Sequence, residues 1–156
     1  MYAVRDEKNE KEFCNFGFRR GSVPGGTEAG DWAGRKTILL ADDEPIVLEV
    51  SSEILHVLGY NVLTAERGDD ALSIYRSHND MIDLVILDMV MPGMTTCEVV
   101  NAMQDIRPDV KILIVSGRKI DDSTRDMMKK GYDGFIQKPF SIPLLSSTVR
   151  EVLNNA

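Results

Sequence analysis

The sequence predicts an α/β domain in which five parallel strands form a doubly wound sheet with helices on both faces. Two observations support this fold class. Short apolar runs bounded by turn residues alternate with longer segments whose apolar residues recur at helical spacing. Several short runs, such as residues 84–87 and 112–115, are apolar at every position, which is typical of strands covered on both faces in a parallel sheet. We therefore expect a series of β-α-β units.

The expected strands and helices alternate from residue 37 to the end of the chain. Strands are expected at residues 37–41, 61–65, 83–88, 111–115 and 134–137. Helices are expected at residues 45–58, 69–78, 96–106, 121–130 and 141–153. The first helix has clear boundary signals, because Pro45 suits a first helical turn and Gly59 suits a helix end. Its helical periodicity places five apolar residues on one face: Val47, Val50, Ile54, Val57 and Leu58.

Composition divides the 156-residue chain near residue 36. Residues 1–36 hold six of the twelve glycines with seven basic and six acidic side chains, so we interpret them as a flexible glycine-rich extension. Residues 37–156 hold eleven basic and nineteen acidic residues and form the expected domain. The net charge of −7 argues against nucleic acid and anionic membrane surfaces as partners. No apolar run reaches the roughly 18 residues of a membrane span, so we expect a cytoplasmic protein.

Polar side chains stand at the carboxyl ends of four expected strands. Asp42 and Asp43 follow the first strand, and Asp88 closes the third. Ser116 closes the fourth strand and Lys138 the fifth. The carboxyl ends of parallel strands share one rim of the sheet, where ligands bind at the topological switch point. We therefore expect these five side chains to converge on one crevice.

The expected cluster joins three carboxylates, one hydroxyl and one amine, and this combination restricts its chemistry. Carboxylates this close do not all stay ionised without a positive partner, and oxygen ligands of this kind suit Mg²⁺. A carboxylate can also attack phosphorus and form an aspartyl phosphate. The metal ion and Lys138 would then neutralise charge on the transferring phosphoryl group. The residues therefore predict reversible phosphorylation of Asp88, with Ser116 donating a hydrogen bond to a phosphoryl oxygen.

Four ordered motifs surround these residues: ILLADDEP, LVILDMVMPGM, ILIVSG and GFIQKPF. Their spacing is 45 residues from Asp43 to Asp88, 28 more to Ser116 and 22 more to Lys138. In motif order and spacing, residues 37–153 resemble the response-regulator receiver domain of two-component phosphorelay systems. The resemblance implies a flavodoxin-like sheet with strand order 2-1-3-4-5. It does not reach residues 1–36.

The resemblance also implies a phosphoryl acceptor and a metal site. Asp88 is similar to the phospho-accepting aspartate of the family and would also contact the metal ion. Asp43 resembles the direct Mg²⁺ ligand, with Asp42 acting through water. The backbone carbonyl of Val90 would be a further ligand.

The remaining motif residues resemble the family's switch machinery. Ser116 and Lys138 would hold the phosphoryl oxygens, and Phe135 falls at the switch-aromatic position. The resemblance implies a cis bond between Lys138 and Pro139. Thr96 is a departure, because the family often has glycine eight residues after the phosphoryl acceptor, and this affects the expected turn into the third helix.

We therefore expect a phosphoryl-accepting signalling module. A sensor histidine kinase or a phosphotransfer protein would present a phosphohistidine, and Asp88 would take the phosphoryl group with Mg²⁺ bound. The domain would catalyse only its own phosphorylation and dephosphorylation, so it is not expected to be an enzyme with other substrates. Because the chain ends eighteen residues after Lys138, the expected output is a switched surface that binds a downstream protein, or onward phosphoryl transfer.

Three alternatives stay open at this point. A phosphatase with an aspartate nucleophile would carry D-x-D-x-[TV] after the first strand, whereas this chain has Asp42-Asp43-Glu44-Pro45. A receiver that signals without phosphorylation is disfavoured, because all five rim residues are present. The chain could also be a piece of a hybrid kinase, with residues 1–36 as a linker.

Overall fold

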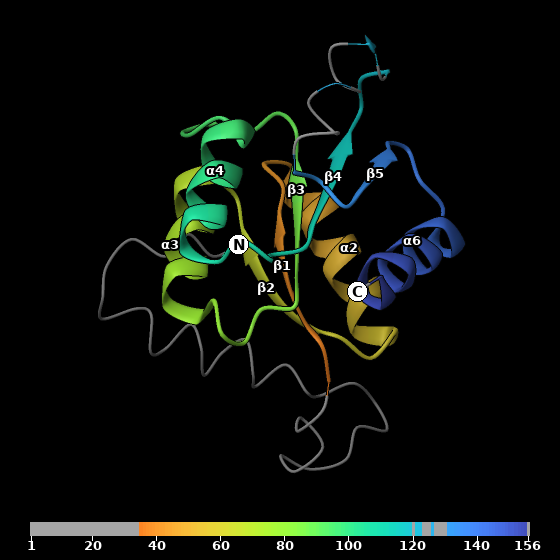
Figure 1. Cartoon of the computed structure of the whole chain (residues 1–156). Helices are drawn as coiled ribbons and strands as arrows, with labels where there is room; N and C mark the ends of the chain where they lie inside the picture. The colour runs from red at the N-terminus through yellow and green to blue at the C-terminus, as the bar shows by residue number, and fades with distance from the viewer. Residues whose placement is uncertain (1–34, 120, 123–125, 127–130, 156) are drawn as a thin grey trace.

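The computed structural model describes residues 35–119, 121–122, 126 and 131–155. Strands and helices alternate along the described chain as far as residue 116 (Figure 1). The strands are β1 (Thr37–Ala41), β2 (Asn61–Ala65), β3 (Leu84–Asp88), β4 (Ile112–Ser116) and β5 (Gly134–Gln137). The helices are α2 (Pro45–Val57), α3 (Gly68–His78), α4 (Thr96–Ile106) and α6 (Ile142–Asn154). Residues 1–34 of the predicted extension, and most of the helix predicted at residues 121–130, lie outside the described residues.

The five strands form one parallel sheet in the order β2-β1-β3-β4-β5. β3 is the central strand and pairs with β1 on one side and β4 on the other, whereas β2 and β5 are the edge strands. This arrangement confirms the predicted doubly wound fold and its strand order. Three strands have the predicted bounds, and the boundaries of β3 and β4 differ by one residue.

Helices cover both faces of the sheet (Figure 1). Leu39 and Ala41 of β1 pack in a core with α3 and α4, whereas Ile38 and Leu40 pack in a second core with α2 and α6. Alternate strand residues point to opposite faces, so every position of β1, β3 and β4 is buried. This double coverage explains why these strands are continuous apolar runs.

The buried face of α2 differs from the apolar face predicted by periodicity. Two residues of the predicted face, Val50 and Val57, are 52% and 74% exposed. The buried residues of α2 are Leu48, Ser51, Ser52, Leu55 and His56. Because the helix carries apolar residues on most of its circumference, periodicity alone does not identify the side that meets the sheet. The prediction was wrong for this helix, and the packing leaves an apolar stripe at its surface.

All five strands point their carboxyl ends to the same rim, so the segments that follow them lie together. The Lys138–Pro139 peptide bond after β5 is cis, as predicted. Across the described part of the chain, every helix falls short of the length and apolar character needed to cross a bilayer.

Candidate functional site

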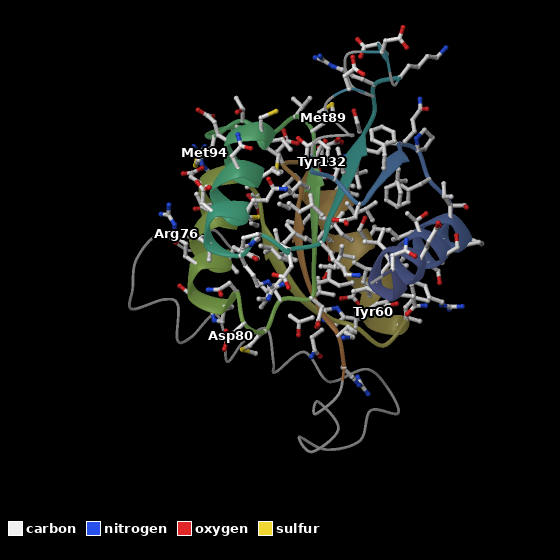
Figure 2. All side chains as sticks on the ribbon, viewed as in Figure 1. Tyr60, Arg76, Asp80, Met89, Met94 and Tyr132 are labelled. Carbon is white, nitrogen blue, oxygen red and sulfur yellow. The ribbon has the colours of Figure 1, made fainter. Side chains whose placement is uncertain are left out.

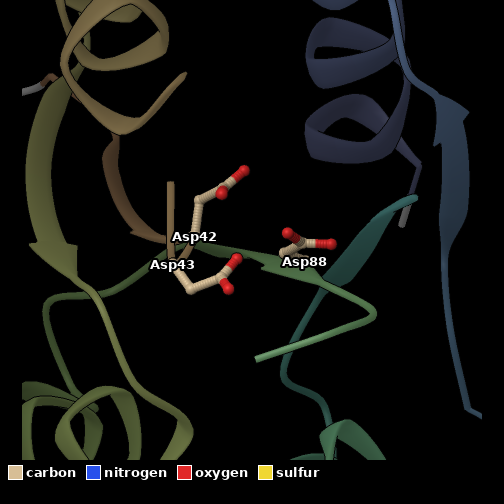
Figure 3. Close-up of side chains that lie close together, drawn as sticks. All are labelled: Asp42, Asp43 and Asp88. Carbon is tan, nitrogen blue, oxygen red and sulfur yellow. The ribbon is translucent and has the colours of Figure 1, made fainter. Parts of the chain in front are cut away.

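Three carboxylates meet at the carboxyl rim of the sheet (Figure 3). Asp42 and Asp43 follow β1, and Asp88 ends the neighbouring strand β3. One carboxylate oxygen of each residue lies within 4.8 Å of the other two. Asp42 and Asp88 are buried, and Asp43 is exposed. The structure therefore brings together the three acidic residues that the strand-end positions predicted to converge.

Lys138 extends from the end of β5 into this acidic cluster. Its Nζ lies 2.6 Å from Asp42 Oδ2 and 3.1 Å from Asp88 Oδ2. A third carboxylate, that of the exposed Glu44, lies 3.7 Å away. The backbone N–H of Glu44 donates to Asp42 Oδ1 at 2.9 Å, which orients the Asp42 side chain. Sequence reasoning named Lys138 but missed Glu44, whose only signal was its place directly after the acidic pair.

The surroundings of Asp88 and Lys138 shift the pKa of both side chains upward. Burial, and then the neighbouring charge of Asp42, raise the pKa of the Asp88 carboxyl above its ordinary value. Hydrogen bonds from Lys138 and from the Val90 N–H act in the opposite direction. Burial lowers the pKa of Lys138. Its hydrogen bonds with Asp42 and Asp88 and the charges of these carboxylates together raise that pKa by a larger amount, so the net shift is upward. The cluster thus has more negative charge than its one lysine balances.

Ser116 lies at the last position of β4 and is 1% exposed. It follows Val115, the β4 partner of Asp88, along the strand. Its Oγ accepts a hydrogen bond from the backbone N–H of Arg118 at 3.1 Å, and its carbonyl accepts one from Lys138 N at 2.7 Å. Phe135 of β5 is half-buried against the core that faces α3 and α4. Both predicted switch residues therefore lie on the strands that follow β3 across the sheet.

The loop after Asp88 is tied to the start of α4. The backbone N–H of Val90 donates to Asp88 Oδ1 at 3.3 Å. Thr95 caps α4 reciprocally with Glu98, whose carboxylate accepts from the Thr95 backbone N–H at 2.8 Å. Thr96 is the first residue of α4, and its Oγ1 lies 3.0 Å from the carbonyl oxygen of Asp88. The turn into α4 forms with threonine at this position, and sequence reasoning did not anticipate the contact.

An apolar groove with a volume of about 540 Å³ lies beside Lys138. It was missed by sequence reasoning because it depends on which side of α2 is left uncovered. Its apolar lining comes from α2 and from the segment after β5: Ile46, Val47, Val50, Ile54, Pro139 and Phe140. Ile46 at its edge is 77% exposed.

A parallel 2-1-3-4-5 sheet with an acidic pair after β1, an aspartate ending β3 and a lysine after β5 defines a class of phosphoryl-accepting signalling domains. The model of the family described as "Response regulator receiver domain" matches residues 38–150. The chain belongs to this family.

Similar proteins agree with this assignment. The chain is 35% identical over 126 residues to the sensor kinase CckA of Brucella abortus, covering 81% of this chain and 13% of that protein. It is similar to a receiver domain structure from Clostridium thermocellum, with 29% identity, a TM-score of 0.72, and coverage of 76% and 94% of the two chains. TrrA of Thermotoga maritima, solved with Mg²⁺ and BeF, is 34% identical with a TM-score of 0.66, covering 75% of this chain and 98% of that one. The chain spans half or less of the length of the curated relatives that it matches.

Proposed function

We propose that Asp88 accepts a phosphoryl group from the phosphohistidine of a sensor histidine kinase or a phosphotransfer protein, with Mg²⁺ bound. The observation that carries this proposal is the contact of one ammonium group, that of Lys138, with both Asp42 and Asp88 at the sheet rim. Residues 37–156 would form the receiver domain and residues 1–36 an extension. Phosphorylation would change a surface of the receiver domain that binds a downstream protein. The domain would act in the cytoplasm.

The acidic cluster suits a hard, oxygen-ligated cation. Oxygen ligands about 2.1 Å from an octahedral Mg²⁺ lie about 3 to 4 Å apart, so oxygens within 4.8 Å need only a small adjustment. Asp43 and Asp88 would bind the ion directly, Asp42 through water, and Val90 through its carbonyl. When bound, the ion would offset the negative charge of the phosphoryl oxygens. The solved TrrA complex with Mg²⁺ and BeF supports this part of the proposal.

The proposed transfer assigns a task to each rim residue. A carboxylate oxygen of Asp88 would form the new P–O bond as the P–N bond to the donor histidine breaks. The electron pair of the broken bond returns to the imidazole nitrogen, and the donor leaves as a neutral imidazole because its other ring nitrogen carries a proton. Lys138 would bind a phosphoryl oxygen, and the hydroxyl of Ser116 would donate to another. The domain would thereby catalyse only its own phosphorylation and, later, hydrolysis of the aspartyl phosphate at Asp88.

The groove beside Lys138 supports a protein donor. The groove is lined by Lys138, which contacts Asp88, so a donor protein bound there would lie beside the phosphoryl acceptor. Pro139 and Phe140, in the segment after β5, contribute to its lining. Val47 and Val50 of α2 also line the groove, so an apolar helix of the donor could bury surface there. Val50→Lys should slow labelling by a purified sensor kinase and leave labelling by acetyl phosphate unchanged.

The direct test is intact-mass spectrometry of the protein incubated with acetyl phosphate and Mg²⁺. We expect wild type to gain one phosphoryl group and Asp88→Asn to gain none. Asp80→Asn is a matched control, because Asp80 is an exposed carboxylate at the end of the sheet opposite Met89 (Figure 2). Undiminished labelling of Asp88→Asn, or label mapped to a histidine, would contradict the proposal.

A further inference from the structure

The hydroxyl group of Thr96 joins the start of α4 to the end of β3. Thr96 is buried, and its Oγ1 lies 3.0 Å from the carbonyl oxygen of Asp88 and 3.0 Å from that of Met89. The register of β1 with β3 ends at Ala41 and Leu87, so the Asp88 carbonyl lies beyond that ladder. The single hydroxyl group therefore lies within donating distance of two adjacent carbonyl oxygens, at the point where β3 ends and the loop begins.

One of these carbonyls belongs to a peptide group that also contacts the Asp88 side chain. The Met89 carbonyl and the Val90 N–H form one planar peptide unit. Its carbonyl accepts from Thr96, and its N–H donates to Asp88 Oδ1 at 3.3 Å. Because the unit is rigid, a bond that fixes the direction of its carbonyl also fixes the direction of its N–H. A donor on the carbonyl also polarises the unit and strengthens the N–H as a donor.

The Asp88 carboxylate is consequently held at both oxygens. Oδ2 faces Lys138 Nζ at 3.1 Å, and Oδ1 faces the Val90 N–H. Lys138 binds one oxygen from the side of β5, and the peptide unit anchored by Thr96 binds the other from the side of α4. Met89 lies at the same end of the molecule as Met94, which precedes α4 (Figure 2).

We propose that Thr96 is a positioning residue for Asp88 and acts through the Met89–Val90 peptide group. This inference rests on the proposed phosphorylation of Asp88. Attack on phosphorus requires a carboxylate oxygen in line with the bond that breaks, so a tilt of the carboxylate slows the reaction. Thr96 does not touch the phosphoryl group, and its effect is to keep the Asp88 carboxylate in one orientation.

The test compares four variants by two measurements. Thr96→Val removes the hydroxyl and keeps the side-chain volume, Thr96→Ala removes the hydroxyl together with side-chain volume, and Thr96→Ser retains the hydroxyl. Thr95→Ala is the matched control, because it removes the N-cap of α4 and leaves the Thr96 hydroxyl in place. The first measurement is the rate of labelling by acetyl phosphate with saturating Mg²⁺. The second is the chemical shift of the Val90 amide proton in metal-free protein, followed by ¹H–¹⁵N NMR.

We expect Thr96→Val and Thr96→Ala to be labelled about tenfold more slowly at saturating acetyl phosphate. Loss of an outer hydrogen bond that orients a functional side chain typically has an effect of this size. The acetyl phosphate concentration for half-maximal rate should not change. The Val90 amide proton should move upfield in both variants, because its hydrogen bond weakens. Thr96→Ser should restore the rate and the shift, and Thr95→Ala should keep both at wild-type values.

Several results would overturn the inference. The first is a wild-type labelling rate and a wild-type Val90 amide shift in Thr96→Val and Thr96→Ala. The second is a Thr96→Ser variant that is labelled as slowly as Thr96→Val. The third is a Thr95→Ala variant that is slowed as much as Thr96→Val. If wild type itself takes no label, the proposed function fails. The Val90 shift then still decides whether Thr96 orients the peptide group beside Asp88.

Discussion

The Nζ of Lys138 lies 2.6 Å from Oδ2 of Asp42, although 96 residues separate the two positions in the sequence. The same ammonium group lies 3.1 Å from Asp88 Oδ2. One cation thus faces two buried carboxylates, and Asp43 adds a third nearby. The cluster retains excess negative charge, which a proton on Asp88 or a bound metal ion would offset.

Asp88→Asn should raise the stability of the metal-free protein at neutral pH. Burial and the charge of Asp42 raise the Asp88 pKa above its ordinary value of 3.8. The stabilising contribution of a raised carboxyl pKa is complete below the unfolded value and is lost as pH rises through the folded value. At pH 7 the ionised side chain therefore lowers stability, and we expect Asp88→Asn to unfold at a higher urea concentration than wild type. Urea unfolding in EDTA at pH 7 and at pH 4 should show the gain shrinking toward the lower pH. A less stable variant at pH 7 would contradict this reasoning, and Asp80→Asn is the control.

Asp43→Asn should lose Mg²⁺ binding and labelling together. A bound Mg²⁺ would relieve repulsion among the three carboxylates, and we expect its affinity to depend on Asp43, the exposed member of the cluster. We expect wild type to bind Mg²⁺ weakly alone and more tightly with beryllofluoride, as measured by calorimetry. Asp109→Asn, which changes an exposed carboxylate outside the cluster, should behave as wild type. Equal binding of beryllofluoride without any divalent ion would show that the assignment is wrong.

Activation should change the region from residue 116 to residue 140. A hydrogen bond from Ser116 to the phosphoryl group would draw its side chain toward Asp88, and Phe135 could rotate into the vacated space. The signalling surface would then comprise the predicted helix at residues 121–130 together with β5 and α6. We expect the largest amide shift changes with Mg²⁺ and beryllofluoride in residues 116–140, with Asp88→Asn as the control. Changes confined to α2 and α3 would refute this location.

The phosphoryl group should be long-lived compared with that of fast-cycling receivers. Val90 and Arg118 stand two residues after Asp88 and Ser116, and both are exposed at the rim. The valine side chain cannot orient a water for in-line attack, and the arginine could lie across the entrance. We expect Val90→Asn to shorten the phosphoryl lifetime at least about threefold, since an amide can position the nucleophile.

The lifetime experiment follows loss of label in excess Mg²⁺ for wild type, Val90→Asn and Arg118→Ala. Arg118→Ala should also speed decay if the arginine shields the site. Wild-type decay as fast as that of Val90→Asn would end the shielding explanation. Slower decay in Arg118→Ala would instead identify Arg118 as an accelerator of hydrolysis.

The sequence by itself was sufficient to predict the order of strands and helices and the rim position of the reactive side chains. Apolar runs such as residues 84–87 and 112–115 are local signals, because a strand buried on both faces must be apolar throughout. Once the strands are parallel, their carboxyl ends share a rim, so Asp42, Asp88 and Lys138 follow from position alone. The family's motifs then supplied the strand order and the expected role of each residue.

Only the tertiary structure decided the contacts between parts of the chain that are distant in sequence. α2 has apolar residues around most of its circumference, so its sequence does not determine which side is buried. In the structure the side with Ser51 and Ser52 packs against the sheet, and the groove beside Lys138 stays uncovered. The Thr96 hydroxyl reaches the Met89 carbonyl because the loop between them folds back on itself. Such contacts depend on which surfaces meet and on how a loop closes, and periodicity and spacing do not encode either.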